Sequence, residues 1–203
     1  YSPPGRIRAA IRAAGLAVDQ IRDGVPFGIV AGNHDATTVF PAWGPGLVVA
    51  DPVTRAAAHE ALRRLEPSGG TAMSKWLLMA RDLFATCPTP RRHAILLTDG
   101  QNNEMPGALE AVLQQCRGLF QVDCRGIGTD WVVGELRTIA STLLGTVDIV
   151  RDPDGVEAGE RLGEPVGGGD ASLDARRQLR QLRTAHGARQ LGRAIVQGHE
   201  LVI

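Results

Sequence analysis

The stretch Arg92-His-Ala-Ile-Leu-Leu-Thr-Asp-Gly100 decides the fold. Its apolar run from His93 to Leu97 is typical of a strand that is buried on both faces of a parallel sheet, and a polar turn follows it. Open α/β sheets bind their ligands at the carboxyl ends of their strands. Asp99 is therefore the first candidate for a binding residue. An Asp-Gly pair is also common in simple turns, and that alternative stays open.

Helical and strand patterns alternate on both sides of this stretch. A hairpin is expected at 26–40, because two short strands there flank a tight turn. Farther along the chain, the alternation predicts βαβ units and a mainly parallel sheet that is covered on both faces. The predicted helices are 4–22, 52–65 with Asp51 as its cap, 73–84, 106–116 and 131–144, and the predicted strands are 26–31, 36–40, 93–98, 120–126 and 146–150.

The composition excludes several classes of protein. The 22 basic and 22 acidic residues cancel, so nothing argues for binding to nucleic acid. We find no signal peptide and no apolar run long enough to span a membrane. Cys87, Cys116 and Cys124 are an odd number without metal-site spacing, which favours a reducing compartment; a pair between Cys116 and Cys124 stays conceivable.

The character of the chain changes after Asp154. Residues 155–169 are rich in glycine and glutamate without a period, and residues 172–196 carry leucines among arginines. We therefore expect a domain over 1–154 and a tail over 155–203. The tail is predicted to be either poorly ordered or one basic helix with a solvated face. A basic amphipathic helix against a partner or a membrane surface is the alternative.

Two polar residues are expected on the same edge of the sheet. Thr71 follows Ser68-Gly-Gly and precedes a helix, for which it is a candidate N-cap, and Asp99 ends the strand at 93–98. A hydroxyl and a carboxylate are oxygen ligands of the kind that Mg²⁺ prefers. The two glycines would let the backbone approach the ion closely. Two ligands alone do not establish a metal site.

Four segments together carry a resemblance to a known family. Phe27-Gly-Ile-Val-Ala31, Ser68-Gly-Gly-Thr71, Ile95-Leu-Leu-Thr-Asp-Gly100 and the run 120–131 resemble, in this order and spacing, a von Willebrand factor type A domain. The likeness covers residues 4–154 and is greatest to bacterial, especially actinobacterial, cytoplasmic proteins. It implies a three-layer α/β/α Rossmann-like sandwich whose mainly parallel sheet has one antiparallel edge strand.

The resemblance also implies a metal-ion-dependent adhesion site built from three motifs. Thr71 matches the threonine motif and Asp99 the aspartate motif, and the cofactor would be Mg²⁺ or Mn²⁺. The first motif, Asp-x-Ser-x-Ser, follows the central first strand of the family, and both are expected to lie upstream of Tyr1 and to be missing here. Ser2 lies beyond the motif and does not replace it.

The missing central strand has a physical consequence. Without it, the strands at Phe27 and Ile95 would each expose unpaired backbone groups along one edge. The sequence therefore predicts a chain that is marginally stable or that borrows a strand from elsewhere.

The resemblance implies a protein-binding module and not an enzyme. A partner protein would offer an Asp or Glu carboxylate to the bound cation, and metal binding would be weak or absent in this fragment because the site is incomplete. A metal-independent helical scaffold is the main alternative. A metal-dependent hydrolase on a similar fold is less favoured, because the chain has no P-loop and no Gly-x-Ser-x-Gly motif.

A few other side chains have two interpretations. Trp76 and Trp131 are expected in the core, whereas Trp43 lies in a Pro/Gly loop and is either exposed or buried under that loop. Asp130 is expected to cap the helix that follows it, with a place on the rim of the site as the alternative.

Overall fold

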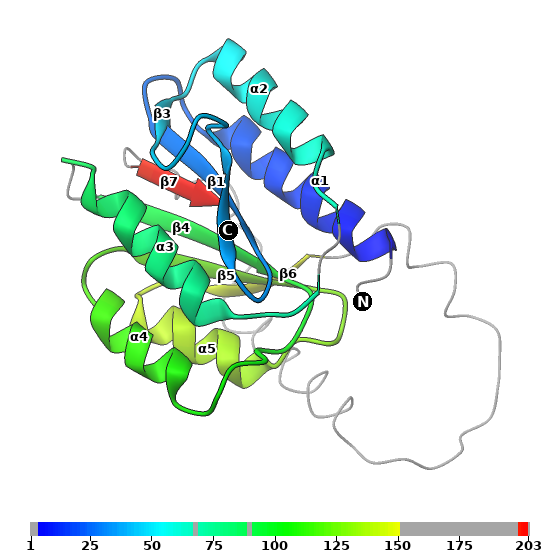
Figure 1. The fold of residues 1–203 in the computed structure, drawn as a ribbon, viewed down its shortest axis with the longest axis vertical. Helices are drawn as coiled ribbons and strands as arrows, with labels where there is room; N and C mark the ends of the chain where they lie inside the picture. Colours follow the sequence, from blue (N-terminus) through cyan, green and yellow to red (C-terminus); the bar gives the residue numbers. More distant parts are fainter. Residues whose placement is uncertain (1–3, 67–68, 89–90, 151–198, 203) are drawn as a thin grey trace, which may run out of the picture. The chain divides into compact units, whose positions relative to one another are not determined.

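Helices and strands alternate over residues 73–150, and one helix, three strands and a second helix precede this part of the chain (Figure 1). The structure is a computed structural model that describes residues 4–66, 69–88, 91–150 and 199–202. The helices are α1 (Pro4–Gln20), α2 (Pro52–Arg63), α3 (Met73–Ala85), α4 (Ala108–Cys116) and α5 (Val133–Thr142). The strands are β1 (Pro26–Gly32), β2 (Ala36–Phe40), β3 (Val48–Val49), β4 (Arg92–Thr98), β5 (Gln121–Ile127), β6 (Val147–Val150) and β7 (His199–Val202).

Most of these elements agree with the sequence pattern. Each predicted helix and strand is present, with ends that differ by a few residues. α2 begins as expected, because the Asp51 side chain accepts a hydrogen bond from the backbone of Thr54 and Pro52 occupies the first helical turn. β3 is an addition, since the segment 41–50 was expected to be a loop.

The strands form one sheet in the order β2-β1-β7-β4-β5-β6, with β3 also paired to β1. β2 and β3 run antiparallel to β1, whereas the pairs β1–β7, β7–β4, β4–β5 and β5–β6 are parallel. The predicted α/β architecture, with a mainly parallel sheet and an antiparallel edge strand, is confirmed.

The centre of the sheet decides between two expectations. β1 and β4 were predicted either to expose one edge each or to borrow a strand from elsewhere, and β7 lies between them and pairs with both. Its register places Val202 beside Ile29 on one side and Ile95 on the other. β7 comes from the stretch assigned to the tail, so the four residues 199–202 belong to the sheet. The basic helix expected within 172–196 falls outside the described residues.

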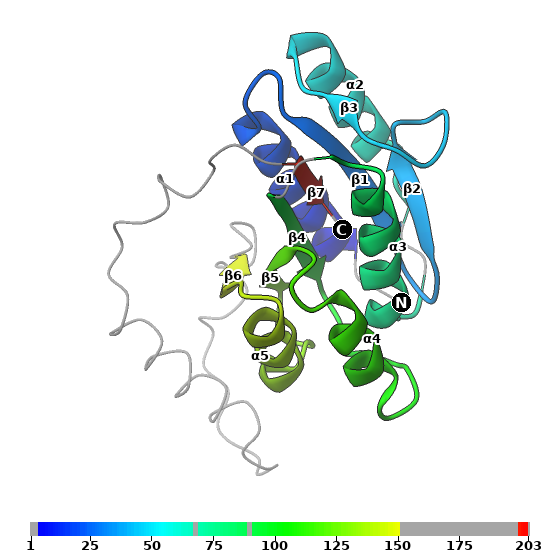
Figure 2. The same cartoon turned by 90° about the vertical axis from the view of Figure 1, so that its left-hand side faces the viewer.

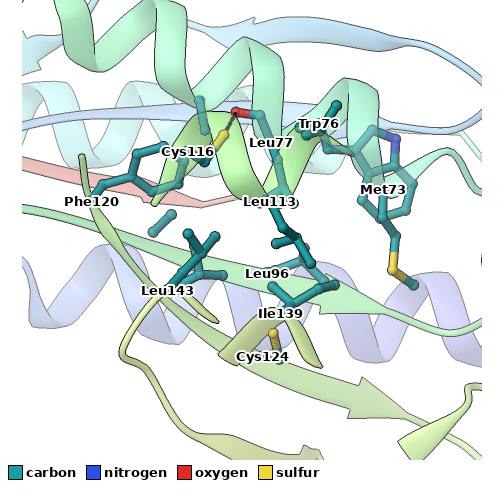
Figure 3. Packing of buried hydrophobic residues seen from close by; sticks show 14 of the residues in the cluster. Met73, Trp76, Leu77, Leu96, Leu113, Cys116, Phe120, Cys124, Ile139 and Leu143 are labelled. Carbon is teal, nitrogen blue, oxygen red and sulfur yellow. Dashed lines mark hydrogen bonds between the residues drawn. The ribbon is translucent and has the colours of Figure 1, made fainter. Parts of the chain in front are cut away.

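Helices cover the two faces of the sheet as separate layers (Figure 2). Ile95 belongs to the buried cluster under α1 and α2, while its neighbours Ala94 and Leu96 belong to the cluster under α3, α4 and α5. This alternation is what a strand buried on both faces requires. Figure 3 shows the second cluster, in which Leu96, Leu113, Ile139 and Leu143 pack together.

The three cysteines are buried free thiols, so the conceivable pair between Cys116 and Cys124 is not formed. The Cys116 thiol donates to the carbonyl oxygen of Leu77 at 3.8 Å (Figure 3). Burial raises the pKa of Cys116 to about 11 and that of Cys124 to about 12. These thiols therefore act as packing groups. Of the helices that the structure describes, none combines the length and apolar character needed to cross a bilayer.

Candidate functional site

Thr71 is held in place by the loop that follows β4. Its backbone N–H donates to the side-chain oxygen of Asn103 at 3.1 Å, and the N–H of Asn103 donates to the carbonyl oxygen of Thr71 at 2.8 Å. This reciprocal pair joins two segments that are far apart in the sequence. As a result, the position of Thr71 relative to the carboxyl end of β4 is fixed.

The same loop caps α3, which corrects the expected role of Thr71 as the N-cap. The N-cap position is Ala72. The N–H of Met73 donates to the Asn102 side chain at 3.2 Å, and the N–H of Ser74 donates to the Glu104 carboxylate at 2.9 Å. Free amides at a helix start need such acceptors, and here they come from a distant loop. Sequence reasoning missed this role, although Asn-Asn-Glu in the loop after a strand is a signal for it.

The turn after β4 brings Gly100, the residue after Asp99, next to Thr71. The Thr98 hydroxyl donates to the carbonyl oxygen of Gly100 at 3.1 Å and tightens the turn. A Cβ atom placed on Gly100 would lie 3.2 Å from the hydroxyl oxygen of Thr71. The Thr71 hydroxyl therefore lies against the residue that follows Asp99. The structure brings the two candidate residues to the same rim of the sheet.

A charged pair completes this rim. Arg6, in the first turns of α1, forms an ion pair with Asp130, which lies beyond the end of β5. The hydrogen bond from Arg6 lowers the pKa of Asp130. In turn, the hydrogen bond to Asp130 raises the pKa of Arg6, and the charge of Asp99 adds to this shift. The guanidinium thus lies in the field of both carboxylates.

Asp130 therefore has the rim position that was the alternative, and it does not cap α5. The N-cap position of α5 is Val132. The long-range pair between Arg6 and Asp130 was not predicted, because their separation in the sequence gives no local signal for it.

Two buried tryptophans pack against the ends of strands near the rim. Both were predicted to lie in the core. Trp76 is 4 % exposed, and its indole N–H donates to the carbonyl oxygen of Asn33 at 2.9 Å. Its ring lies over Gly32, where a Cβ atom would come within 2.3 Å. Trp131 lies over Gly126 in the same way. Trp43, in contrast, is 78 % exposed.

The candidate residues line a cavity of about 660 Å³. Its lining includes the polar residues Arg6, Thr71, Asp99, Asn103 and Asp130 and the apolar residues Ile7, Ile11, Ile29 and Leu97. A concave apolar site with a few convergent polar groups is the usual form of a binding site.

A sequence model of the von Willebrand factor type A domain matches residues 3–149. The chain belongs to this family. Among curated proteins, none matches the chain. A solved von Willebrand factor type A protein from Catenulispora acidiphila is 48 % identical with a TM-score of 0.71, and the match covers 75 % of this chain and 36 % of that protein. This likeness is consistent with the actinobacterial type that was expected.

Two more distant structures share the von Willebrand factor type A (vWA) fold. Proximal thread matrix protein 1 from the mussel byssus, solved with zinc in its metal-ion-dependent adhesion site, is 24 % identical with a TM-score of 0.58, covering 77 % of this chain and 39 % of that one. BatB from Bacteroides thetaiotaomicron is 20 % identical with a TM-score of 0.55, and the match covers 74 % of this chain and 82 % of that one. The chain therefore spans little more than a third of the first two proteins.

The donors at the rim of this vWA domain fit a hard divalent cation in kind but are few. Thr71 offers a hydroxyl oxygen and Asp99 a carboxylate, and the carboxylate of Asp130 is paired with Arg6. No group of three or more His, Cys, Asp or Glu side chains suited to a metal gathers within the described residues. Oxygen donors with water in the remaining positions suit Mg²⁺ or Mn²⁺.

Proposed function

We propose that the chain is a protein-binding module in which Thr71 and Asp99 hold a divalent cation, Mg²⁺ or Mn²⁺. A carboxylate from a partner protein would take one of the remaining coordination positions. The observation that supports this proposal is the closeness of the Thr71 hydroxyl to Gly100, directly after Asp99: a Cβ atom placed on Gly100 would lie 3.2 Å from the hydroxyl oxygen. A hydroxyl and a carboxylate on one rim, at the mouth of a cavity, can share one ion.

The surrounding residues of the protein hold the two proposed ligands, Thr71 and Asp99, in position. Asn103 fixes the backbone of Thr71, and the turn made by Thr98 fixes Asp99. When bound, the cation would supply the positive charge that a partner carboxylate needs. His34, His59 and His93 do not line the cavity. Because no histidine among the described residues lines the cavity beside Asp99, we assign binding and not catalysis to the site.

Arg6 should weaken cation binding, because its guanidinium lies in the field of both Asp99 and Asp130. A divalent cation that binds at the rim would be repelled by this nearby positive charge. We therefore expect weak affinity in this chain. The same guanidinium offers a direct contact to a carboxylate when no cation is present, which is the form that a metal-independent module would take.

Calorimetric titration with Mn²⁺ tests the proposal. Asp99→Asn and Thr71→Ala should each reduce the affinity by roughly tenfold or more, because each removes one of two protein ligands. Arg6→Gln should raise the affinity several-fold, whereas Arg8→Gln, an exposed position on the same helix, removes the same charge and should change it little.

Acetate serves as the minimal carboxylate in the same titration. It should strengthen Mn²⁺ binding to the unmodified chain and not to Asp99→Asn. Unchanged Mn²⁺ affinity in both ligand variants would overturn the metal site. Binding of acetate that needs Arg6 and ignores Mn²⁺ would favour the metal-independent module.

A further inference from the structure

Leu144, which follows the last residues of α5, has an unusual backbone conformation for its side chain. Its φ of 57° is the only positive φ at a residue other than glycine within the described part of the chain. This left-handed region brings the Cβ atom too close to the next carbonyl oxygen, so helices that end in this way usually have glycine or asparagine there. Burial does not compensate the strain, because Leu144 is 72 % exposed. A strained and exposed leucine points to a role outside the packing of the domain.

A second exposed leucine lies close by. Leu119 is 42 % exposed and comes two residues before Gln121, in the turn from α4 into β5. The side-chain amide of Gln121 donates to the carbonyl oxygen of Leu144 at 3.4 Å, in the turn from α5 into β6. Both turns lie at the same end of the sheet (Figure 1). The two leucines therefore flank Gln121 at the amino end of β5 and β6.

Basic residues accompany the leucines at this end of the sheet. Arg117, the C-cap of α4, comes two residues before Leu119, and Arg91 comes directly before β4, the strand that pairs with β5. Both arginines are exposed. No acidic residue occurs in the segments that lead into these three strands, 85–91, 117–120 and 143–146. A ligand at this end of the sheet therefore meets positive charge beside apolar surface.

Acidic side chains on neighbouring elements do not cancel this charge. Asp82 of α3 is in an ion pair with Arg81, and Asp123 of β5 is in one with His93. A basic residue at the end of a helix, such as Arg117, also complements the helix dipole, and that is its ordinary role. The arginines alone therefore establish no binding surface. The exposed leucines between them carry the argument.

We propose that this surface binds an acidic amphipathic segment of a partner protein. We call it the amino-end patch, and it consists of Arg91, Arg117, Leu119, Gln121 and Leu144. Leucines of the segment would pack on the two leucines of the patch, and its Asp or Glu side chains would pair with the two arginines. Burial by the partner would give Leu144 the contacts that the domain itself does not provide. The patch lies at the opposite end of the strands from the proposed cation and does not depend on it.

The size and charge of the amino-end patch favour a polypeptide over a membrane surface. Segments that bind anionic membranes carry clusters of about four to eight basic residues, and interfacial helices also use aromatic side chains. The patch has two arginines and no aromatic residue. Two leucines beside one another instead suit an amphipathic helix, which presents apolar anchors three or four residues apart.

Titration of the whole chain with the peptide Ac-Glu-Leu-Asp-Glu-Leu-Leu-Glu-Glu-NH₂ tests the proposal. The readout is the ¹⁵N-resolved amide shifts, and the buffer contains EDTA. We expect shifts centred on residues 117–121 and 143–146 and on Arg91, with a Kd of roughly 0.3 mM, as suits so small a surface. Added salt should weaken binding, because exposed charges are screened. The same peptide with lysine at every acidic position should bind at least about tenfold more weakly.

Leu144→Asn is the most informative variant, because asparagine tolerates the left-handed conformation better than leucine does. It should raise the Tm by roughly 2–4 °C and still weaken peptide binding by about tenfold. Leu16→Asn, at a leucine that is 63 % exposed on α1, is the matched control and should leave the affinity unchanged. Arg117→Gln should weaken binding by about threefold, whereas Arg8→Gln on α1 should not.

Three outcomes of the titration would overturn the proposal: equal binding of the acidic and the lysine peptide, shifts away from the amino-end patch, or no binding at about 5 mM peptide. A lower Tm for Leu144→Asn would show that Leu144 packs within the domain, and it would also overturn the proposal. Vesicles that contain phosphatidylserine are the last comparison. Binding of the chain to these vesicles through Leu144, without peptide binding, would assign the patch to a membrane surface and refute a partner protein.

Discussion

The two edges of β4 differ, and the difference locates the candidate site. Toward β5, the register runs from His93–Gln121 to Thr98–Gly126 without interruption. Toward β7, the described pairs run from Arg92–His199 to Ile95–Val202, and Leu97 and Thr98 at the end of β4 line the cavity; we call this the interrupted side of β4. The cavity and the polar rim lie on the interrupted side. The residues of the proposed cation site thus lie on the side of β4 where the described pairing is shorter, and β5 pairs with the whole of the other side from His93 to Thr98.

The largest expected effect concerns the free energy of unfolding, and two adjacent leucines on β4 test it. Leu96 is 0 % exposed and belongs to the enclosed cluster under α3, α4 and α5, whereas Leu97 lines the cavity. Leu96→Ala should lower the free energy of unfolding by about 3 kcal/mol, because it creates a void in a closed core. Leu97→Ala should cost about 1 kcal/mol, because its side chain already borders open space.

Urea denaturation of both variants against the unmodified chain measures these costs. Ile95→Ala is a useful third variant, because Ile95 faces the same layer as Leu97 without lining the cavity. Equal losses for Leu96→Ala and Leu97→Ala would show that the interrupted side is packed as tightly as the completed one.

The next largest effect is expected from alanine substitutions at the two glycines that tryptophan rings cover. A Cβ atom at Gly126 would lie 2.1 Å from the ring of Trp131, and one at Gly32 would lie 2.3 Å from the ring of Trp76. Both alanine substitutions overpack the site, but Trp76 borders the cavity and can move into it. Gly126→Ala should therefore cost about 2 kcal/mol and Gly32→Ala about 1 kcal/mol.

Thermal melts followed by circular dichroism test this order. Gly69→Ala, where a Cβ atom meets nothing within 4 Å, is the matched control and should leave the melting temperature almost unchanged. A larger loss for Gly32→Ala than for Gly126→Ala would contradict the idea that the cavity gives Trp76 room.

The smallest expected effect concerns acid stability on the completed side. Burial by itself raises the pKa of Asp123, but hydrogen bonds from His93 and Thr146 outweigh it and lower the pKa to about 2. A folded-state pKa below the unfolded value of 3.8 stabilises the fold above pH 4. This contribution is lost as the pH falls from 4 toward 2 and should amount to a loss of about 1 kcal/mol at pH 3.

Denaturation at pH 6 and at pH 3 measures this linkage. Asp123→Asn keeps an acceptor for Thr146 but cannot titrate, so its loss between the two pH values should be smaller than that of the unmodified chain. An identical pH dependence in both proteins would show that other carboxyl groups account for the acid loss.

The sequence predicted those features that depend on local pattern. The period of apolar residues placed the helices and strands, and the position of Thr71 and Asp99 after glycines and a strand placed both near one rim. Trp76 and Trp131 were expected in the core because each lies in or beside an apolar helical pattern, and both are buried.

The features that were missed depend on contacts between distant segments. The run His199–Val202 is too short to be recognised as a strand without knowing that β1 and β4 leave a gap for it. The pair between Arg6 and Asp130 joins positions 124 residues apart. The capping of α3 by Asn102 and Glu104 likewise needs the fold before its donors and acceptors can meet.

The loop after β4 has a mechanical consequence for any ligand at the rim. Asn103 holds Thr71, Asn102 and Glu104 hold the first amides of α3, and the N–H of Asn102 donates to Glu135 of α5 at 3.1 Å. A pull on the Thr71 hydroxyl would therefore strain the start of one helix and the anchor of another at once. A ligand bound at Thr71 would therefore alter the hydrogen bonds at the starts of α3 and α5, which Asn102, Asn103, Glu104 and Glu135 form.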